Sequence, residues 1–141
     1  RIWLFDVGRA AASSALVALH RRAAMAIVVC RSEHESLVQV PSRVAALRAG
    51  GTLTGVVVVG RPQFGRADLQ SFFGSHFTWI VPADAGLVEA SRRVWSDKRV
   101  RRSQLWRSAL NIADDVDDAT RARSMAPPVT VDHDAEVRRV G

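Results

Sequence analysis

The chain has 141 residues, of which 48% are hydrophobic and 24% are charged, and its net charge is +6. This length and apolar content suffice for one domain with a buried core, and no apolar run reaches the roughly 20 residues of a membrane-spanning helix. The positive charge permits binding to nucleic acid or anionic lipid. The net charge discriminates little between functions. The composition is rich in Arg and Ala and has a single lysine, Lys98, and this bias in composition explains the charge more simply than a binding function does. The lone cysteine, Cys30, lies in an apolar run and is expected to be a small core residue in a reducing compartment.

The first predicted strand covers Ile2–Phe5 and is followed by Asp6-Val7-Gly8. An apolar run that ends in an acid and a glycine is typical of a buried strand in a parallel sheet. Such a strand delivers its carboxylate to the sheet edge where α/β proteins bind their ligands. The run begins at the first residue, so we expect the chain to start inside a domain. Apolar residues at helical spacing follow, as far as Met25.

The second predicted strand, Ala26–Cys30, is apolar on both faces, as expected for a central strand of a parallel sheet. A helix is predicted over Ser32–Ala49. Ser32 and Glu35 have the spacing of a capping box, and an apolar stripe is formed by Leu37, Val40, Val44 and Leu47. Pro41 is expected to kink this helix or to split off its first turn.

The rest of the chain continues to alternate between strand and helix. Strands are predicted over Leu53–Val59 and Phe77–Val81, and helices over Arg66–Phe73, about Gly86–Trp95 and Ser103–Val116. Gly50-Gly51 is expected to close the preceding helix with a left-handed cap. Residues 1–116 are therefore predicted to form one α/β domain, a mostly parallel sheet with helices on both faces. In residues 117–141 the apolar periodicity fades, which predicts a disordered tail.

Three strand ends carry the residues best placed for chemistry. They are Asp6-Val7-Gly8, Gly60-Arg61-Pro62 and Pro82-Ala83-Asp84. In a parallel sheet all three lie at one edge, so they are expected to converge on a single ligand. The Asp6 carboxylate would suit a metal-bound water in a nucleoside triphosphate site, with the Gly8 amide close to the γ-phosphate. The alternative is that Asp6 only caps the helix that follows it.

The order and spacing of these turns resemble the C-terminal part of a MinD/ParA-type P-loop ATPase, a family of deviant-Walker nucleotide switches. The resemblance covers roughly Arg1–Val116. It rests on five segments. Asp6-Val7-Gly8 resembles the end of the family's switch II strand, and Ala26–Arg31 with Ser36-Leu37 resembles the next strand and its helix start. Val56–Arg61 resembles the strand that often ends in Asn-Arg or Asn-Lys, Ile80–Asp84 resembles the Ile-Pro-x-Asp turn, and Arg101-Arg102-Ser103 with Leu105 resembles the start of the closing helix. The implied fold is P-loop NTPase-like and incomplete at its N-terminus, because no glycine-rich phosphate loop precedes the first strand.

The resemblance implies an ATP and Mg²⁺ site and a role for each matching residue. Asp6 would be the catalytic residue, holding Mg²⁺ through a water and sensing the γ-phosphate, and Gly8 would let the switch move. Arg61, Pro82 and Asp84 would belong to the nucleotide site, the last two bordering the adenine or the dimer interface. Both cofactors require the missing N-terminal half.

Two departures from the family pattern bear on activity. Gly60 stands where an Asn normally contacts the base, and the phosphate loop with its lysines is absent from these residues. We therefore expect this chain alone not to hydrolyse ATP. In the family's sheet the phosphate-loop strand lies between the first two strands predicted here, so Ile2–Phe5 and Ala26–Cys30 should either pair directly or splay apart.

A basic run lies towards the C-terminus, with Trp95 and Trp106 interleaved. Its members are Arg92, Arg93, Lys98, Arg99, Arg101 and Arg102. Guanidinium groups pair with phosphates, so the run is a candidate for nonspecific contact with DNA or a membrane surface. Three alternatives stay open: a solvated helix face with inward-facing Trp residues, a DNA contact, and a contact with membrane or protein.

Three functions remain to be compared. The leading one is a MinD/ParA-like positioning or partitioning ATPase that acts on chromosomes, a division site, or a secretion or pilus apparatus. Such a protein would be cytoplasmic with nucleoid or membrane association, would form an ATP-dependent homodimer, and by its composition looks actinobacterial. The alternative is a non-catalytic α/β binding module that acts through protein or DNA contacts. A receiver-type or flavodoxin-like domain is disfavoured, because Lys98 lies outside a strand end.

Overall fold

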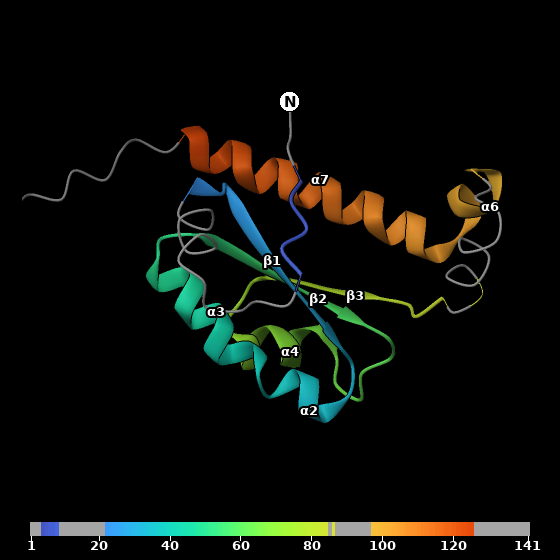
Figure 1. Ribbon diagram of the computed structural model, residues 1–141, viewed down its shortest axis with the longest axis horizontal. Helices are drawn as coiled ribbons and strands as arrows, with labels where there is room; N and C mark the ends of the chain where they lie inside the picture. The colour runs from blue at the N-terminus through green and yellow to red at the C-terminus, as the bar shows by residue number, and fades with distance from the viewer. Residues whose placement is uncertain (1–3, 9–21, 85, 87–96, 126–141) are drawn as a thin grey trace, which may run out of the picture.

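The computed structural model describes residues 4–8, 22–84, 86 and 97–125 (Figure 1). In this part of the chain, three parallel strands form one sheet in the order β1-β2-β3. Helices α2, α3 and α4 pack on one face, and helix α7 packs on the other. The prediction of an α/β fold with a parallel sheet and helices on both faces is confirmed.

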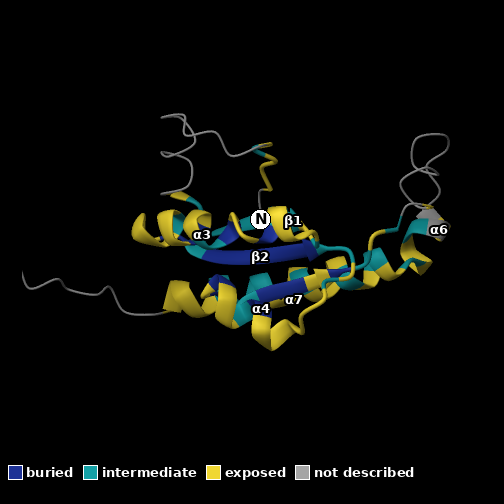
Figure 2. Cartoon of the chain, turned by 90° about the horizontal axis from the view of Figure 1, so that it is seen from below, coloured by how far each residue is buried: buried dark blue, intermediate teal, exposed yellow. Residues whose placement is uncertain are grey.

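The central strand is the most buried element (Figure 2). Strand β2 covers Leu53–Val59, between β1 at Met25–Arg31 and β3 at Phe77–Val81. Its run of β-branched residues is apolar on both faces, which suits a strand covered on both sides. Val56 and Val58 are fully buried on one face, and Val57 contributes to the core on the other. The bounds predicted for β2 and β3 are confirmed, and β1 is one residue longer at each end than predicted.

The first face of the sheet is covered by three short helices: α2 at His34–Leu37, α3 at Val40–Ala49 and α4 at Arg66–Phe73. Pro41 lies in the first turn of α3, where a missing N–H costs no helical hydrogen bond, so the predicted split of the helix is confirmed. The predicted capping box is wrong, because the N-cap of α2 is Glu33 and it makes no side-chain cap bond. Of the two closing glycines, Gly51 is left-handed, with φ of 78°.

The second face is covered by α7, a helix over Gln104–Met125 that follows α6 at Asp97–Arg102. Its side chains Leu105, Ile112 and Val116 pack against the core of Val57, Trp79 and Val81. The spacing of these three residues places them on one stripe of the helix. No helix in the described part of the chain is long and apolar enough to cross a membrane.

The predicted end of the last helix at Val116 is corrected, because α7 continues to Met125. Its last turns hold together through local polar contacts rather than apolar packing. Asp117 pairs with Arg121, and Thr120 Oγ1 donates to the Val116 carbonyl at 2.8 Å. Arg123 donates to the Gly51 carbonyl at 2.6 Å, which ties the helix end to the turn before β2. Residues 126–141 of the predicted tail lie outside the described residues.

The predicted first strand is also corrected where it is described. Leu4–Gly8 has no regular secondary structure, and the side chains of Leu4 and Phe5 are 93% and 63% exposed. Among the described residues β1 pairs only with β2, so Leu4–Gly8 does not add a strand to the other edge of β1. Leu4 and Phe5 therefore do not pair with β1. Residues 1–3 and the helix predicted over the residues up to 21 lie outside the described part.

Candidate ligand site at the carboxyl edge of the sheet

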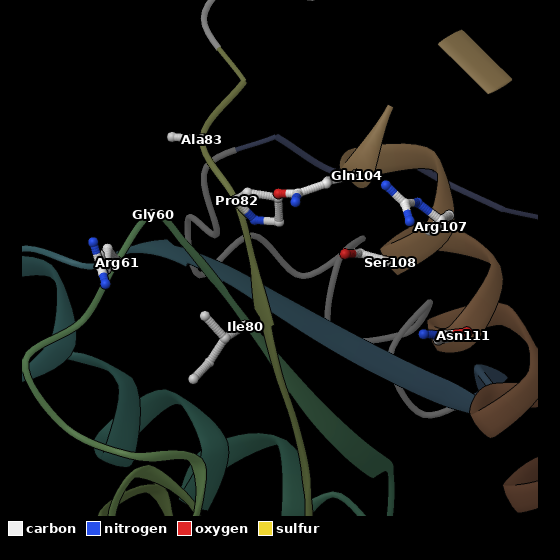
Figure 3. A pocket seen from close by; sticks show the side chains of 9 residues that line it. All are labelled: Gly60, Arg61, Ile80, Pro82, Ala83, Gln104, Arg107, Ser108 and Asn111. Carbon is white, nitrogen blue, oxygen red and sulfur yellow. The ribbon is translucent and has the colours of Figure 1, made fainter. Parts of the chain in front are cut away.

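A pocket of about 730 Å³ opens where β2 and β3 end and α7 begins (Figure 3). It is lined by Gly60, Arg61, Ile80, Pro82, Ala83, Gln104, Arg107, Ser108 and Asn111. It is a hollow open to solvent, since six of its nine lining residues are exposed. Its position is the carboxyl edge of a parallel sheet, which is where α/β folds bind their ligands.

Gly60 forms the turn that ends β2. Its N–H donates to the Val81 carbonyl at 2.8 Å, which holds the ends of β2 and β3 together. Its φ is +115°, and a Cβ at this position would lie 2.5 Å from the Ser32 Oγ. Both the conformation and the space therefore require glycine. An Asn here, as in the family that the sequence resembles, would be strained and would clash with Ser32.

The end of β3 supplies the apolar part of the pocket. Trp79 and Val81 are buried on the α7 side of the sheet, so Ile80, which alternates with them and is 37% exposed, points to the opposite side of β3 from α7 (Figure 3). Pro82 follows at once and, lacking an N–H, ends the strand. Beside α7 the strand end therefore presents Pro82 and Ala83, which have no hydrogen-bonding side chain.

Helix α7 supplies most of the polar part. Its lining residues recur at helical spacing, so they share one face of the helix. They are Gln104, Arg107, Ser108 and Asn111. In Figure 3 the side chains of Ser108 and Asn111 extend from α7 towards β3.

Two contacts, a hydrogen bond and an apolar stripe, hold α7 against the sheet, and a local N-cap fixes where the helix begins. The Trp79 Nε1–H donates to Asp115 Oδ2 at 2.7 Å, which ties β3 to the middle of the helix. Ser103 Oγ accepts from the Trp106 N–H at 3.1 Å, as an N-cap does. The apolar stripe of α7 packs on the sheet. The polar face of the helix is thereby held against the strand ends.

The charge of the pocket is positive. Arg61 comes from the loop after β2 and Arg107 from α7, and none of the lining residues is acidic. Guanidinium groups can hold a phosphate or carboxylate through two parallel hydrogen bonds. The pocket therefore has the chemistry to bind an anionic ligand that also has an apolar or aromatic part.

The structure brings together only some of the predicted nucleotide-site residues. Arg61 and Pro82 line the pocket. Asp84 follows two residues later and is half-buried, outside the lining.

The residues predicted for catalysis and switching are not part of this lining. Asp6 is exposed, and its Oδ1 accepts from the Gly8 N–H at 2.9 Å in a local turn, where Gly8 has φ of 63°. No cluster of three or more His, Cys, Asp or Glu side chains that could hold a metal occurs in the part of the chain that the structure describes. In this part, the polar contact of Asp6 is local to its own turn.

The basic run is described only in part. Arg92 and Arg93 lie outside the described residues, and for Arg99 only the backbone position in α6 is described. Lys98, Arg101 and Arg102 are exposed on α6. The Arg101 guanidinium carbon lies 5.9 Å from the centroid of the half-buried Trp106 ring, a cation–π contact. Trp106 is thus engaged by the basic run itself.

The lining residues of α7 were not predicted from the sequence. Their signal is a polar stripe beside the apolar stripe of the predicted helix over Ser103–Val116. Periodicity alone could have grouped them on one face. It could not show that this face meets the strand ends, since that depends on how α7 lies on the sheet.

Comparison with protein-family models, with curated proteins and with solved structures finds no match for this chain. A functional proposal therefore depends on the residues, their geometry and the resemblance noted in the sequence.

Proposed function

We propose that the chain is a nucleotide-binding domain of the MinD/ParA type and that, contrary to the expectation from the absent phosphate loop, it binds ATP by itself at the carboxyl edge of its sheet, because Arg61 and Arg107 line a pocket there. One observation carries the proposal: the turns after β2 and β3, which the sequence predicts to converge, line a single pocket with two arginines and no acid. Arg61 and Arg107 would pair with the phosphates. Pro82 and Ala83 would provide apolar surface for the base or ribose.

The resemblance extends this proposal to a cellular role. The protein would be an ATP-dependent positioning or partitioning ATPase, acting as a homodimer on chromosomes, a division site, or a secretion or pilus apparatus. The exposed residues Lys98, Arg101 and Arg102 would then be available for nonspecific contact with DNA or a membrane surface.

The described residues do not fit a Mg²⁺ site. Asp6 contributes a single exposed carboxylate, one oxygen of which already accepts a hydrogen bond from the Gly8 amide. Mg²⁺ in nucleotide sites is held by one or two carboxylates together with phosphates and waters, and the pocket lining has no carboxylate. The chain would therefore bind the nucleotide without turning it over.

A second candidate is a non-catalytic binding module that acts through protein or DNA contacts. The conformation of Gly60 favours it, because the turn excludes the Asn that the resembled family uses to contact the base. This candidate predicts that nucleotides do not bind the pocket.

Calorimetric titration of the full chain with ATP tests the proposal. We expect saturable binding, with a loss of about tenfold to a hundredfold in affinity for Arg61→Ala and for Arg107→Ala, since hydrogen bonds between charged groups contribute about 1.5–3 kcal/mol. Arg43→Ala is the matched control, because Arg43 is exposed on α3 across the sheet from α7. Absence of binding, or an equal loss in the Arg43 variant, would reject the proposal and leave the binding module.

A further inference from the structure

We infer that Asp115 of α7 is a positioning residue for the pocket. Its bond to Trp79 keeps the helix against the strand ends, and a ligand in the pocket stabilises that bond in return. The inference rests on the proposed function and concerns how binding in the same pocket depends on the position of α7. Asp115 itself lies outside the pocket lining, so its effect on the ligand is indirect.

The pocket is built from two separate parts of the chain. The turns after β2 and β3 form one part, which includes Arg61 and Pro82, and the first turns of α7 form the other, which includes Gln104 and Arg107. In Figure 3 the side chain of Gln104 extends towards Pro82, across the boundary between the two parts. A ligand held by both arginines bridges this boundary. Such a ligand therefore binds fully only when α7 lies against the strand ends.

Helix α7 is held on the sheet with little apolar burial. None of its 22 residues is buried, and the apolar stripe of Leu105, Ile112 and Val116 is only half-buried. Each of the three helices on the opposite face, by contrast, buries at least one apolar side chain. Burial therefore stabilises the docking of α7 less than that of the other helices, and single polar contacts have more influence on its position.

The bond between Trp79 and Asp115 joins the same two elements that meet at the pocket. The Nε1–H of the buried Trp79 donates to Asp115 Oδ2 at 2.7 Å. Trp79 precedes Pro82 on the strand by about 10 Å. Asp115 follows Asn111 by about one helical turn, so it continues the polar stripe that lines the pocket. The bond and the pocket therefore lie along one contact between β3 and α7, and opening of this contact disrupts both.

Coupling between the bond and the ligand is reciprocal, because each stabilises the other by the same free energy. ATP should therefore slow hydrogen exchange at the indole N–H of Trp79, since exchange requires the bond to Asp115 to open. At an ATP concentration a hundred times the dissociation constant, this exchange should slow by about tenfold to a hundredfold. Nuclear magnetic resonance of the full wild-type chain measures the rate, and the signal is assigned by its loss in Trp79→Phe.

Titration of full-chain variants with ATP tests the coupling in the other direction. Asp115→Ala removes the acceptor and should weaken ATP binding by about twofold to tenfold. This loss is opposite to the effect of charge, because removal of a carboxylate near an anion site would by itself strengthen ATP binding. Asp115→Asn keeps an acceptor oxygen and should restore most of the affinity.

Asp114→Ala is the matched control, because Asp114 is an exposed acid on the same helix outside the pocket lining, and its loss should not weaken ATP binding. Circular dichroism shows whether each variant folds, and the exchange measurement on the wild-type chain does not depend on any variant. An indole exchange rate that saturating ATP leaves unchanged, or equal ATP affinity in Asp115→Ala and Asp114→Ala, would overturn the coupling and leave the nucleotide site standing. If the wild-type chain does not bind ATP, the proposed function fails and this inference fails with it.

Discussion

At the scale of single residues, the absence of a side chain at Gly55 helps to place α7. A Cβ on Gly55 would lie 2.5 Å from Cζ3 of Trp79 and 2.8 Å from Cε of Met25, so the glycine in β2 makes room for the indole. The indole N–H in turn donates to Asp115 of α7. The small residue in the strand thereby allows the contact that holds the helix, and with it the pocket, against the sheet.

Cys30 provides a test of packing through its titration. Partial burial raises the pKa of its thiol to about 11, and its Sγ lies 3.7 Å from the Val57 carbonyl oxygen. Because the thiolate is disfavoured in the folded state, labelling by a thiol reagent at pH 8 to 9 should be slower in the folded chain than in urea, and should accelerate towards pH 11.

The same shift predicts the pH dependence of stability. With the folded pKa above the value of 9.0 for an unperturbed thiol, the folded state binds more protons between these values. The contribution of Cys30 to stability is therefore present below pH 9 and is lost as pH rises towards 11. In a Cys30→Ala variant, the free energy of unfolding should lose this dependence on alkaline pH. In the labelling experiment, equal rates for the folded and the unfolded chain would contradict a packed thiol.

At the scale of elements, the sequence predicted strands better than it predicted the ends of the chain. The bounds of β2, α4 and β3 follow from dense apolar runs between glycines and prolines, where local pattern and tertiary burial agree. The extension of α7 beyond Val116 could not be read from apolar periodicity, because the Asp117–Arg121 pair and the Arg123–Gly51 contact stabilise it. The strand expected at Ile2–Phe5 needs a neighbouring strand to pair with, and an apolar run in the sequence does not show whether such a neighbour is present.

The extension of α7 is testable with a helix-breaking substitution. Thr120→Pro removes one backbone N–H and places the proline ring against the Val116 carbonyl, a cost of about 3 kcal/mol inside a helix. We expect a weaker helical circular dichroism signal and a free energy of unfolding that is lower by about 1–3 kcal/mol. The smaller losses of free energy are expected if only the last turns of α7 unwind. Thr120→Ala is the control, since alanine favours helix. Equal circular dichroism in the two variants would show that these turns are not helical in solution.

At the scale of the whole molecule, one layered arrangement explains the site. Helices α2, α3 and α4 close one face, α7 closes the other, and the strand ends meet the first turns of α7 at one edge (Figure 1). The sequence predicted the convergence of Arg61 and Pro82, because parallel strands end at the same edge. It missed the α7 residues, because the angle at which a helix crosses a sheet depends on packing such as that of Trp79.

The most direct test of the account is amide chemical-shift mapping of the isotope-labelled full chain during titration with ATP. Nucleotide at the carboxyl edge should shift the amides of Gly60, Arg61, Ala83 and residues 104–111, in proportion to saturation. The amides of α3, on the far face of the sheet, should stay unchanged. Shifts centred on α3, or no saturable shift at the strand ends and the first turns of α7, would contradict nucleotide binding at this edge.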